Sequence, residues 1–404
     1  MTDQANPLPL PLSGLRVLDL TNVLAGPFCT YLLSLMGAEV VKIEQPGRGD
    51  LARRLGADPE AAARGMGASF VAVNAGKQSV TLDLKHPEGK EVFRRLVATA
   101  DAMVENFRPG VMDRLGLGWK ALSALRPSLV LCSISGFGAD GPMASRPAYD
   151  QIIQGVAGVM SVTGDAASAP LRVGYPVSDT TGGMTAAFAV VSALLGARAT
   201  GVGRFVDVSM LEATLSAMGW VVSNHLNAGV DPVPMGNDNF TAAPSGTFRT
   251  RDGLLNIAAN EDRQFGALCR LLGREDLVAD PRFAARAARK ANRAALNEAV
   301  EAALAARGAA QWEVLLVEAG VPAGRVLSVP EIMADPQVRG RGFVAELEGP
   351  DGPQRVTRAG FRFGDLNPAP RAPAPALSAD TDRWLAELGY GAEDIARLRG
   401  AGVL

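Results

Sequence analysis

The chain has 404 residues, 48% of them hydrophobic and 20% charged, with a formal net charge of −2 at pH 7. This length exceeds one simple core and predicts two domains, and the near-neutral charge excludes strong electrostatic attraction to nucleic acid or an anionic membrane. The longest apolar run, residues 185–197, is shorter than the roughly 20 residues that span a bilayer, and the N-terminus lacks the basic region of a signal peptide. We expect a cytoplasmic protein without nucleic-acid or membrane partners.

Residue types that often carry chemistry are scarce. The chain has three cysteines, Cys29, Cys132 and Cys269, and this odd, scattered set argues against a disulfide framework. Its two histidines, His86 and His225, lie in no suggestive context, and no cysteine or histidine pair has the spacing of metal ligands. We therefore expect no metal site. If the protein is an enzyme, carboxylates, amides or a cofactor must carry the reaction.

The first half of the chain alternates strand-like and helix-like segments. Short apolar runs predict buried strands at 14–20, 39–43, 79–84, 101–107 and 129–135. Helices are expected between them, at 27–37 and at 87–97, where Pro87 occupies the first helical position. This alternation predicts right-handed βαβ units and a mostly parallel sheet, which binds its ligand at the carboxyl ends of the strands.

The pattern changes in the second half. Helical residues at 210–222 lead into a loop at 228–246, and a hairpin is predicted at 245–259 with its turn at 251–253. Three helical segments within 261–320 complete a smaller α+β domain at 225–325. A second hairpin at 343–356, an extended Pro/Ala-rich stretch at 367–376 and two short helices end the chain.

Polar residues follow or bracket several of the predicted strands. The first strand–helix turn, residues 21–27, has one glycine before its proline, so the dinucleotide fingerprint is absent. Past the strand at 101–107 stand Asn106, Arg108 and Arg114, which could meet an anion or could simply be solvated. Lys77 and Lys85 bracket the strand at 79–84, and lysines in such positions usually extend into water.

One carboxylate stands at the start of the long apolar segment. The stretch V-S-D-T-T-G-G-M places Asp179 before small polar residues and then A-A-F-A-V-V-S-A-L-L. Taken alone, this pattern is typical of an N-cap residue. A carboxylate beside the unpaired N–H groups of a helix start could also be a reagent. The helix dipole would then keep it ionised at neutral pH.

Ordered motifs along the whole chain resemble the class III coenzyme A transferases, the CaiB/BaiF family. They include G-L-R-V-L-D-L-T, A-G-P, G-A-E-V-V-K-I-E, V-T-L-D-L-K, V-E-N-F-R-P-G-V-M-D-R-L-G and S-D-T-T-G-G-M. The resemblance implies an α/β fold with a Rossmann-like, coenzyme A-binding large domain, made from residues 1–224 and 326–404. The smaller domain at 225–325 is inserted between these parts. The family resemblance also implies a homodimer whose two subunits are interlocked like linked rings.

The resemblance also implies roles for single residues. Asp179 matches the family's nucleophile. The coenzyme A and substrate contacts of the formyl-CoA transferase branch match Ala25, Leu82, Lys85, Asn106, Phe107, Arg108, Arg114 and the segment 147–150, which includes Tyr149 and Asp150. Leu24 replaces a glutamine of that branch, Gln45 replaces an arginine, and its glycine-rich lid has no close counterpart in residues 235–246.

The resemblance implies a CoA-transferase that exchanges one thioester for another. The acyl-CoA is then a substrate, no tightly bound cofactor is expected, and Asp179 forms an acyl anhydride and then an aspartyl-CoA thioester. The alternative is an α-methylacyl-CoA racemase of the same fold. That branch has a histidine where this chain has Tyr149, and a phenol is a poor substitute for imidazole near pH 7. Glu261 matches an acidic residue of the racemase site, but it can equally cap the helix that follows.

Loop polarity suggests the class of acceptor. Asn237, Asp238, Asn239 and Thr241 make the 235–246 loop small and polar, and Arg172 lies close to Asp179 in the sequence. The sequence therefore predicts a small, polar mono- or dicarboxylic acid as acceptor, with succinyl-CoA as a plausible donor.

Overall fold

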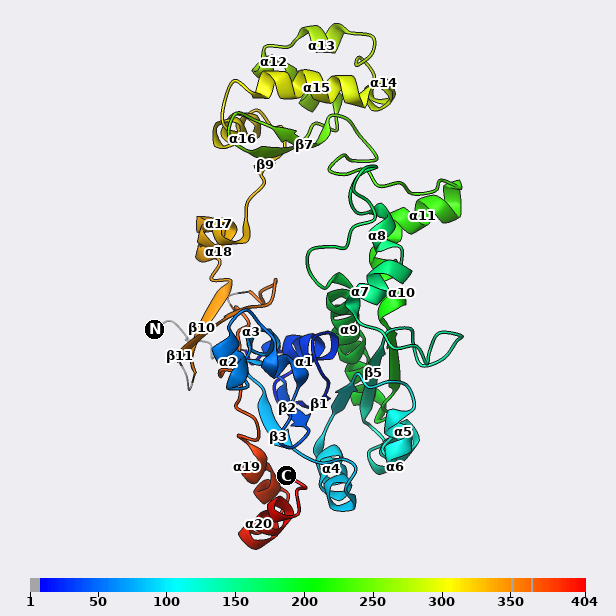
Figure 1. Ribbon diagram of the computed structural model, residues 1–404, viewed down its shortest axis with the longest axis vertical. Helices are drawn as coiled ribbons and strands as arrows, with labels where there is room; N and C mark the ends of the chain where they lie inside the picture. The colour runs from blue at the N-terminus through cyan, green and yellow to red at the C-terminus, as the bar shows by residue number, and fades with distance from the viewer. Residues whose placement is uncertain (1–7, 350–351, 365) are drawn as a thin grey trace. The chain divides into compact units, whose positions relative to one another are not determined.

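The computed structural model describes residues 8–349, 352–364 and 366–404 (Figure 1). Residues 1–7, residues 350–351 within the predicted second hairpin, and residue 365 lie outside this range. The described chain divides into two compact units. The larger contains the chain up to Val159, Arg172–Val230 and Gly340–Leu404, and the smaller contains Met160–Leu171 and Asp231–Arg339.

The larger unit is built on a parallel sheet of six strands in the order β3-β2-β1-β4-β5-β6. The strands are β1 (Arg16–Leu20), β2 (Glu39–Glu44), β3 (Gln78–Thr81), β4 (Ala102–Glu105), β5 (Val130–Ser135) and β6 (Phe205–Ser209). The order reverses direction between β1 and β4, as in doubly wound dinucleotide-binding folds. In such sheets the ligand lies outside the carboxyl ends of the strands at this reversal.

Helices cover both faces of the sheet, which explains why its strands are almost continuously apolar. On one face α1 (Ala25–Leu35) and α9 (Val177–Thr200) pack in a core that includes Val17. On the other face α4 (Pro87–Thr99), α6 (Trp119–Leu125), α19 (Thr381–Glu387) and α20 (Ala392–Gly400) pack in a core that includes Leu18. The neighbours Val17 and Leu18 point to opposite faces, as strand geometry requires.

Shorter elements complete the larger unit (Figure 1). They are η1 (Leu51–Arg54), α2 (Pro59–Ala63), α3 (Ala68–Asn74), α5 (Val111–Leu115), α7 (Asp150–Val156), α10 (Met210–Ala217), α11 (Gly219–Ala228) and the antiparallel pair β10 (Val344–Gly349) and β11 (Gly352–Thr357). Helix α8 (Val159–Val162) lies in the smaller unit except for its first residue. The C-terminal segment contacts the edge strand β3 directly, because the N–H of Thr81 donates to the hydroxyl of Thr381 in α19 at 3.0 Å. Both ends of the chain thus contribute to this unit.

The smaller unit has an antiparallel sheet in the order β7-β8-β9, covered by helices. Its strands are β7 (Ser245–Arg249), β8 (Leu254–Ala258) and β9 (Ala323–Arg325), and its helices are α12 (Asp262–Leu272), α13 (Asp276–Ala279), α14 (Arg286–Ala291), α15 (Arg293–Leu304), α16 (Ala309–Glu318), α17 (Val329–Ala334) and α18 (Pro336–Gly340). The predicted hairpin and its turn are confirmed. The expectation of three helical segments in 261–320 was wrong. Five occur, because two short helices, α13 and α14, lie between α12 and α15.

Helix α9 is longer than the apolar run at 185–197 that the sequence analysis identified. It spans 24 residues, and by length and composition alone it is the one described helix that could cross a membrane. The expectation that no segment reaches this length was therefore wrong. Core helices of soluble proteins meet the same criterion, and 44% of the apolar window is buried within the chain. Its first two turns carry the candidate nucleophile and the glycines that follow it.

Candidate active site

Two cavities open where the strand order reverses. Strands β1 and β4 pair in parallel with Leu20 opposite Glu105, so the residues that follow these two positions emerge side by side. The first cavity, of about 270 Å³, and the second, of about 320 Å³, share Asn22 and Phe107 in their walls. We call them the apolar cavity and the Asp179 cavity, because the second is the one that Asp179 lines.

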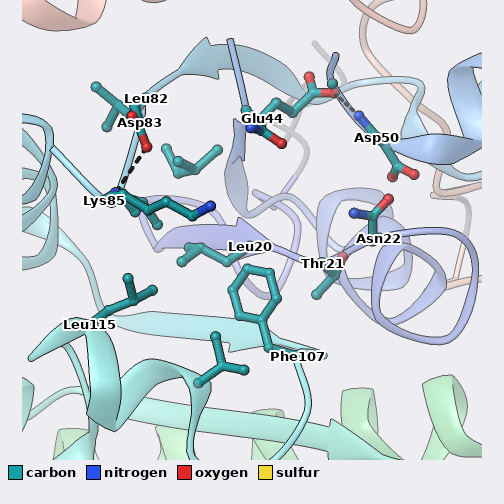
Figure 2. A pocket seen from close by; sticks show the side chains of 15 residues that line it. Leu20, Thr21, Asn22, Glu44, Asp50, Leu82, Asp83, Lys85, Phe107 and Leu115 are labelled. Carbon is teal, nitrogen blue, oxygen red and sulfur yellow. Dashed lines mark hydrogen bonds between the residues drawn. The ribbon is translucent and has the colours of Figure 1, made fainter. Parts of the chain in front are cut away.

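The apolar cavity lies over the ends of the first four strands (Figure 2). Its walls are mainly hydrocarbon and aromatic, from Leu20, Ile43, Leu82, Phe107, Val111 and Leu115. Figure 2 shows the Lys85 side chain reaching in from one side and the Phe107 ring from the other. Three carboxylates, from Glu44, Asp50 and Asp83, and one cation, Lys85, also line this cavity. Its hydrocarbon walls suit an aromatic base, and Lys85 is the group that could pair with a phosphate attached to that base.

The Asp179 cavity combines a carboxylate with two cations. Its polar and charged walls include Arg108, Arg146, Tyr149 and Asp179, and the start of α1 contributes Leu24 and Ala25. Neither guanidinium makes a hydrogen bond or ion pair with any described residue. The cavity therefore offers an anion two free guanidinium groups close to a potential nucleophile.

The structure brings together most of the residues that the sequence singled out. Leu82, Lys85 and Phe107 line the apolar cavity, and Ala25, Asn106, Phe107, Arg108, Tyr149 and Asp179 line the other. Arg114 lies on α5, whose Val111 and Leu115 line the apolar cavity, but its own side chain lines neither cavity. Asp150 is buried beside the site, and Arg172 lines neither cavity. Sequence reasoning missed Arg146, which no local pattern distinguishes from a surface arginine.

The prediction that Asp179 caps a helix was wrong. Helix α9 begins at Val177, two residues earlier, and Asp179 lies inside its first turn. The cap comes from Asp150 on α7, whose Oδ1 accepts the N–H groups of Ser178 at 2.8 Å and Asp179 at 3.4 Å. Asp150 is held in turn by the buried Gln154 amide, which donates to its other oxygen at 2.7 Å. The first N–H groups of α9 are therefore occupied rather than open to a ligand.

This arrangement also changes the expected charge state of Asp179. Burial, together with the negative charge of Asp150, raises the pKa of Asp179 to about 7. We expected the helix start to keep the carboxylate ionised, but Asp150 occupies that start and adds a like charge. A carboxyl with a pKa near 7 is present in both forms at neutral pH, as is common for reactive groups in enzymes.

The start of α1 lies against the same part of α9. A Cβ atom added to Gly183 would lie 2.6 Å from the carbonyl oxygen of Ala25, so the two backbones touch there. Asp179 is four residues before Gly183 and therefore on the same side of α9. Leu24 is the N-cap of α1 and has no side chain that can cap it. Among the described residues, the N–H groups of Leu24, Ala25 and Gly26 have no hydrogen-bond partner.

Local contacts decide the interpretation of Glu261. Glu261 is the N-cap residue of α12, and its N–H donates to the Gln264 side chain at 3.0 Å, which confirms the capping interpretation. All three cysteines are buried, and none is joined to another described residue by a disulfide. Within the described residues no group of three or more His, Cys, Asp or Glu side chains could hold a metal ion.

The larger unit is a doubly wound sheet whose strand-order reversal carries an apolar cavity and a carboxylate-bearing cavity. Residues 12–381 match the model of CoA-transferase family III, and the chain belongs to this family. It is 38% identical to the succinate–glutarate CoA-transferase of Agrobacterium fabrum, over 96% of this chain and 98% of that protein. It is 39% identical to the acetyl-CoA:oxalate CoA-transferase of Acetobacter aceti, over 90% and 92%. A CaiB/BaiF family structure from Brucella suis matches with a TM-score of 0.84 and 36% identity, covering 94% of this chain and all of that one.

Proposed function

We propose that this protein transfers coenzyme A from an acyl-CoA, with succinyl-CoA as the favoured donor, to a small dicarboxylic acid. The observation that carries the proposal is Asp179, a half-buried carboxylate with a pKa of about 7, in a cavity that adjoins an apolar cavity at the strand-order reversal. Similar proteins are named for succinate, glutarate and oxalate, all of which are dicarboxylic acids. The chain needs no cofactor for this exchange, because the acyl-CoA is a substrate.

An acyl-CoA bound across the two cavities would pass their shared wall. The adenine ring would lie against Leu82 and Phe107 in the apolar cavity, with Lys85 beside the phosphate groups. The pantetheine arm would then pass Asn22 and Phe107, which both cavities share. This path brings the thioester to Asp179, with Arg108 on the way to receive an anionic or amide group.

Asp179 would act as the nucleophile. Its carboxylate attacks the thioester carbon, the CoA thiolate leaves, and a mixed anhydride of Asp179 and the acyl group forms. The thiolate then attacks the aspartyl carbonyl, which releases the donor acid and leaves an aspartyl-CoA thioester. The acceptor carboxylate attacks this thioester, the thiolate leaves again and a second anhydride forms. Attack of the thiolate on the acceptor's acyl carbon restores Asp179 and completes the new thioester.

Each attack creates a negatively charged oxygen that needs hydrogen-bond donors. The N–H groups at the start of α9 are engaged by Asp150, so they are poor candidates. The unpartnered N–H groups of Leu24, Ala25 and Gly26 stand at the start of α1, beside the same cavity. We assign the oxyanion to them, because Leu24 cannot fold a polar side chain over these donors.

The proposal is tested by offering the purified protein several acyl-CoA donors with a panel of mono- and dicarboxylic acids. Mass spectrometry of the product thioesters should reveal a new acyl-CoA in at least one succinyl-CoA and dicarboxylate pair. The absence of product from every short-chain pair would refute the proposal. Deuterium exchange at the α-carbon of an unreacted acyl-CoA would instead identify the racemase alternative, although the exposed phenol of Tyr149, where that branch has a histidine, argues against it.

Burial and the charge of Asp150 together should set the pH dependence of transfer. Only the ionised form of Asp179 attacks, so the rate of enzyme acylation should rise with pH through about 7. Replacing Asp150 by Asn removes a like charge but keeps an oxygen for the Ser178 N–H. The pKa of Asp179 should fall, and the rising limb of kcat/KM against pH should move to lower pH. Asp150→Ala, which loses both the charge and the cap, is measured beside it. If the rising limb of the pH profile does not move in Asp150→Asn, the role of the Asp150 charge is contradicted.

Arg146 is the candidate for the acceptor's second carboxylate. It lines the Asp179 cavity, and no described residue neutralises it. Replacing it by Gln should lower kcat/KM for a dicarboxylic acceptor by about 10- to 100-fold, the value of one charge-assisted hydrogen bond. The value for a monocarboxylic acid should change little. The matched control is Arg198→Gln at the far end of α9. An equal loss for both classes of acid would contradict the assignment.

We further propose that the protein is a cytoplasmic, interlocked homodimer. Large apolar side chains on α9 and α11 are exposed in the single chain: Met184 is 55%, Phe188 76%, Leu195 73% and Trp220 82% accessible. A second copy of the chain would cover this surface, which gives α9 an apolar partner other than lipid. In this proposal the larger unit binds both coenzyme A and the acceptor acid, because both cavities are lined by its residues.

A further inference from the structure

The loop between β1 and α1 is held by side chains at every backbone group from the N–H of Thr21 to the N–H of Val23. Asp19 accepts the N–H of Thr21 at 2.9 Å, and the Lys42 ammonium donates to its carbonyl at 2.9 Å. The Asn106 side chain brackets the next residue, because its Oδ1 accepts the N–H of Asn22 at 2.8 Å. Its Nδ2 donates to the carbonyl of Asn22 at 2.9 Å. Asp50 accepts the N–H of Val23 at 3.0 Å.

These contacts hold an unfavourable backbone conformation. Val23 has a φ of +67°, in the left-handed region that a β-branched residue rarely adopts. A strained residue of this kind persists only where its surroundings fix it, and such positions concentrate at functional sites. The strain at Val23 therefore requires the side chains that bind the loop.

The residues that hold the loop come from four different places in the larger unit. Asp19 lies in β1, Lys42 in β2, Asp50 just after β2 and Asn106 just after β4. Asp19, Lys42 and Asp50 are almost fully buried, at 0%, 0% and 2% exposure. Lys42 pairs with Asp50 at 2.9 Å, and the buried Lys77 pairs with Asp19 at 2.8 Å. Burying four charges is costly, and well-packed apolar residues would often be as stable, so stability alone does not account for them.

The first backbone donors beyond the loop are the ones left open. The N–H groups of Leu24, Ala25 and Gly26 follow Val23 directly and have no partner among the described residues. Asn22, Val23, Leu24 and Ala25 all line the Asp179 cavity. A loop held at five consecutive groups thus ends in three unused donors, beside the proposed nucleophile.

We propose that Asn106, with Asp50 and Lys42, is a positioning residue that fixes this loop so that the donors at the start of α1 meet the oxyanion. The inference rests on the proposed function and changes the part expected of Asn106. The sequence suggested a direct contact with coenzyme A, whereas both polar atoms of its side chain bind the backbone of Asn22. A positioning role acts on the transition state, and a ligand contact acts on substrate binding.

Asn106→Ala separates these two roles. Asn106 is not fully buried, so the variant should fold, and loss of the bracket should let the loop and its donors shift. Because small misplacements and lost oxyanion donors both act on the reaction step, kcat should fall by about 10- to 100-fold. The KM for the acyl-CoA donor and the Kd of free coenzyme A, measured by calorimetry, should stay within a few-fold of the wild-type values.

Asn367→Ala provides the matched control, because the Asn367 amide also donates to backbone carbonyls, those of Arg341 and Gly342, but lines neither cavity. It should leave kcat unchanged. An unchanged kcat in Asn106→Ala, or a fall matched by weaker binding of coenzyme A, would overturn the positioning role. A wild-type protein that transfers no coenzyme A would overturn the proposed function instead, so the two failures are distinguishable.

Discussion

Replacing Asp179 by Ala or Asn should abolish CoA transfer while leaving coenzyme A bound. The variant lacks the only carboxylate that lines the Asp179 cavity among the described residues, so no anhydride can form. We expect kcat to fall by more than about 10⁴-fold, as for other enzymes that lose their nucleophile. The Kd of free coenzyme A should change little, because the apolar cavity and Lys85 are untouched.

Covalent trapping supplies the second measurement. When wild-type protein is incubated with acyl-CoA and then with hydroxylamine, the peptide that contains Asp179 should gain the mass of a hydroxamate. Asp140→Asn, a change of an exposed carboxylate that lines neither cavity, is the control and should be trapped normally. Trapping at another residue, or transfer that survives in Asp179→Asn, would show that the nucleophile lies elsewhere.

The strands were predictable because each is a short apolar run in a sheet covered on both faces. All five strands expected in the first half exist, and their bounds differ from the predicted ones by a few residues at most. The helix that begins with Pro87 was also placed correctly, since proline at the first helical position is a local signal. The carboxyl ends of these strands do carry the two cavities.

The start of α9 could not be read from local sequence, because its cap comes from another helix. Asp150 lies 29 residues before Asp179 in the chain. An Asp followed by small polar residues has the same pattern whether it caps the helix or lies inside its first turn. The raised pKa of Asp179 has the same origin, since it depends on burial and on a charge brought close by the fold.

The buried charges show that a lysine beside a strand does not always extend into water. Lys77 was expected to extend into water, but its ammonium donates to Asp19, the Pro27 carbonyl, Thr30 and Asn74 and is buried. A signal existed, because Asp19 and Lys42 each interrupt an otherwise apolar strand, R-V-L-D-L and E-V-V-K-I. A charge at a position that the sheet must bury requires a partner. Which partner it finds depends on strand order, which the sequence pattern does not contain.

The bounds of the smaller unit also differ from those that the sequence predicted. The sequence placed a domain at 225–325, whereas the compact unit also includes Met160–Leu171 and continues to Arg339. The early segment joins it through a backbone contact, in which the N–H of Gly236 donates to the carbonyl of Gly164 at 2.6 Å. Such a contact between segments far apart in the chain leaves no trace in composition or periodicity.

Gly183→Ala should impair both stability and transfer. The added methyl group would lie 2.6 Å from the Ala25 carbonyl and 3.1 Å from the Phe28 ring, so α1 must move away from α9. Overpacking of this kind costs about 1–3 kcal/mol, which exceeds the gain of about 1 kcal/mol or less from replacing glycine in a helix. The displaced start of α1 carries the proposed oxyanion donors away from Asp179, so kcat should fall by about 10²-fold.

Gly196→Ala is the matched control on the same helix, because its added methyl group would meet no atom within 4 Å. It should raise the unfolding free energy by about 0.5–1 kcal/mol and leave kcat unchanged. Denaturant unfolding and steady-state kinetics of both variants distinguish the contributions. If Gly183→Ala loses stability but keeps its kcat, the spacing of α1 and α9 serves the core alone. If kcat falls while the KM for acyl-CoA is kept, the close approach of the two helix starts is part of the reaction site, because a packing change elsewhere in the core would leave the donors where they are.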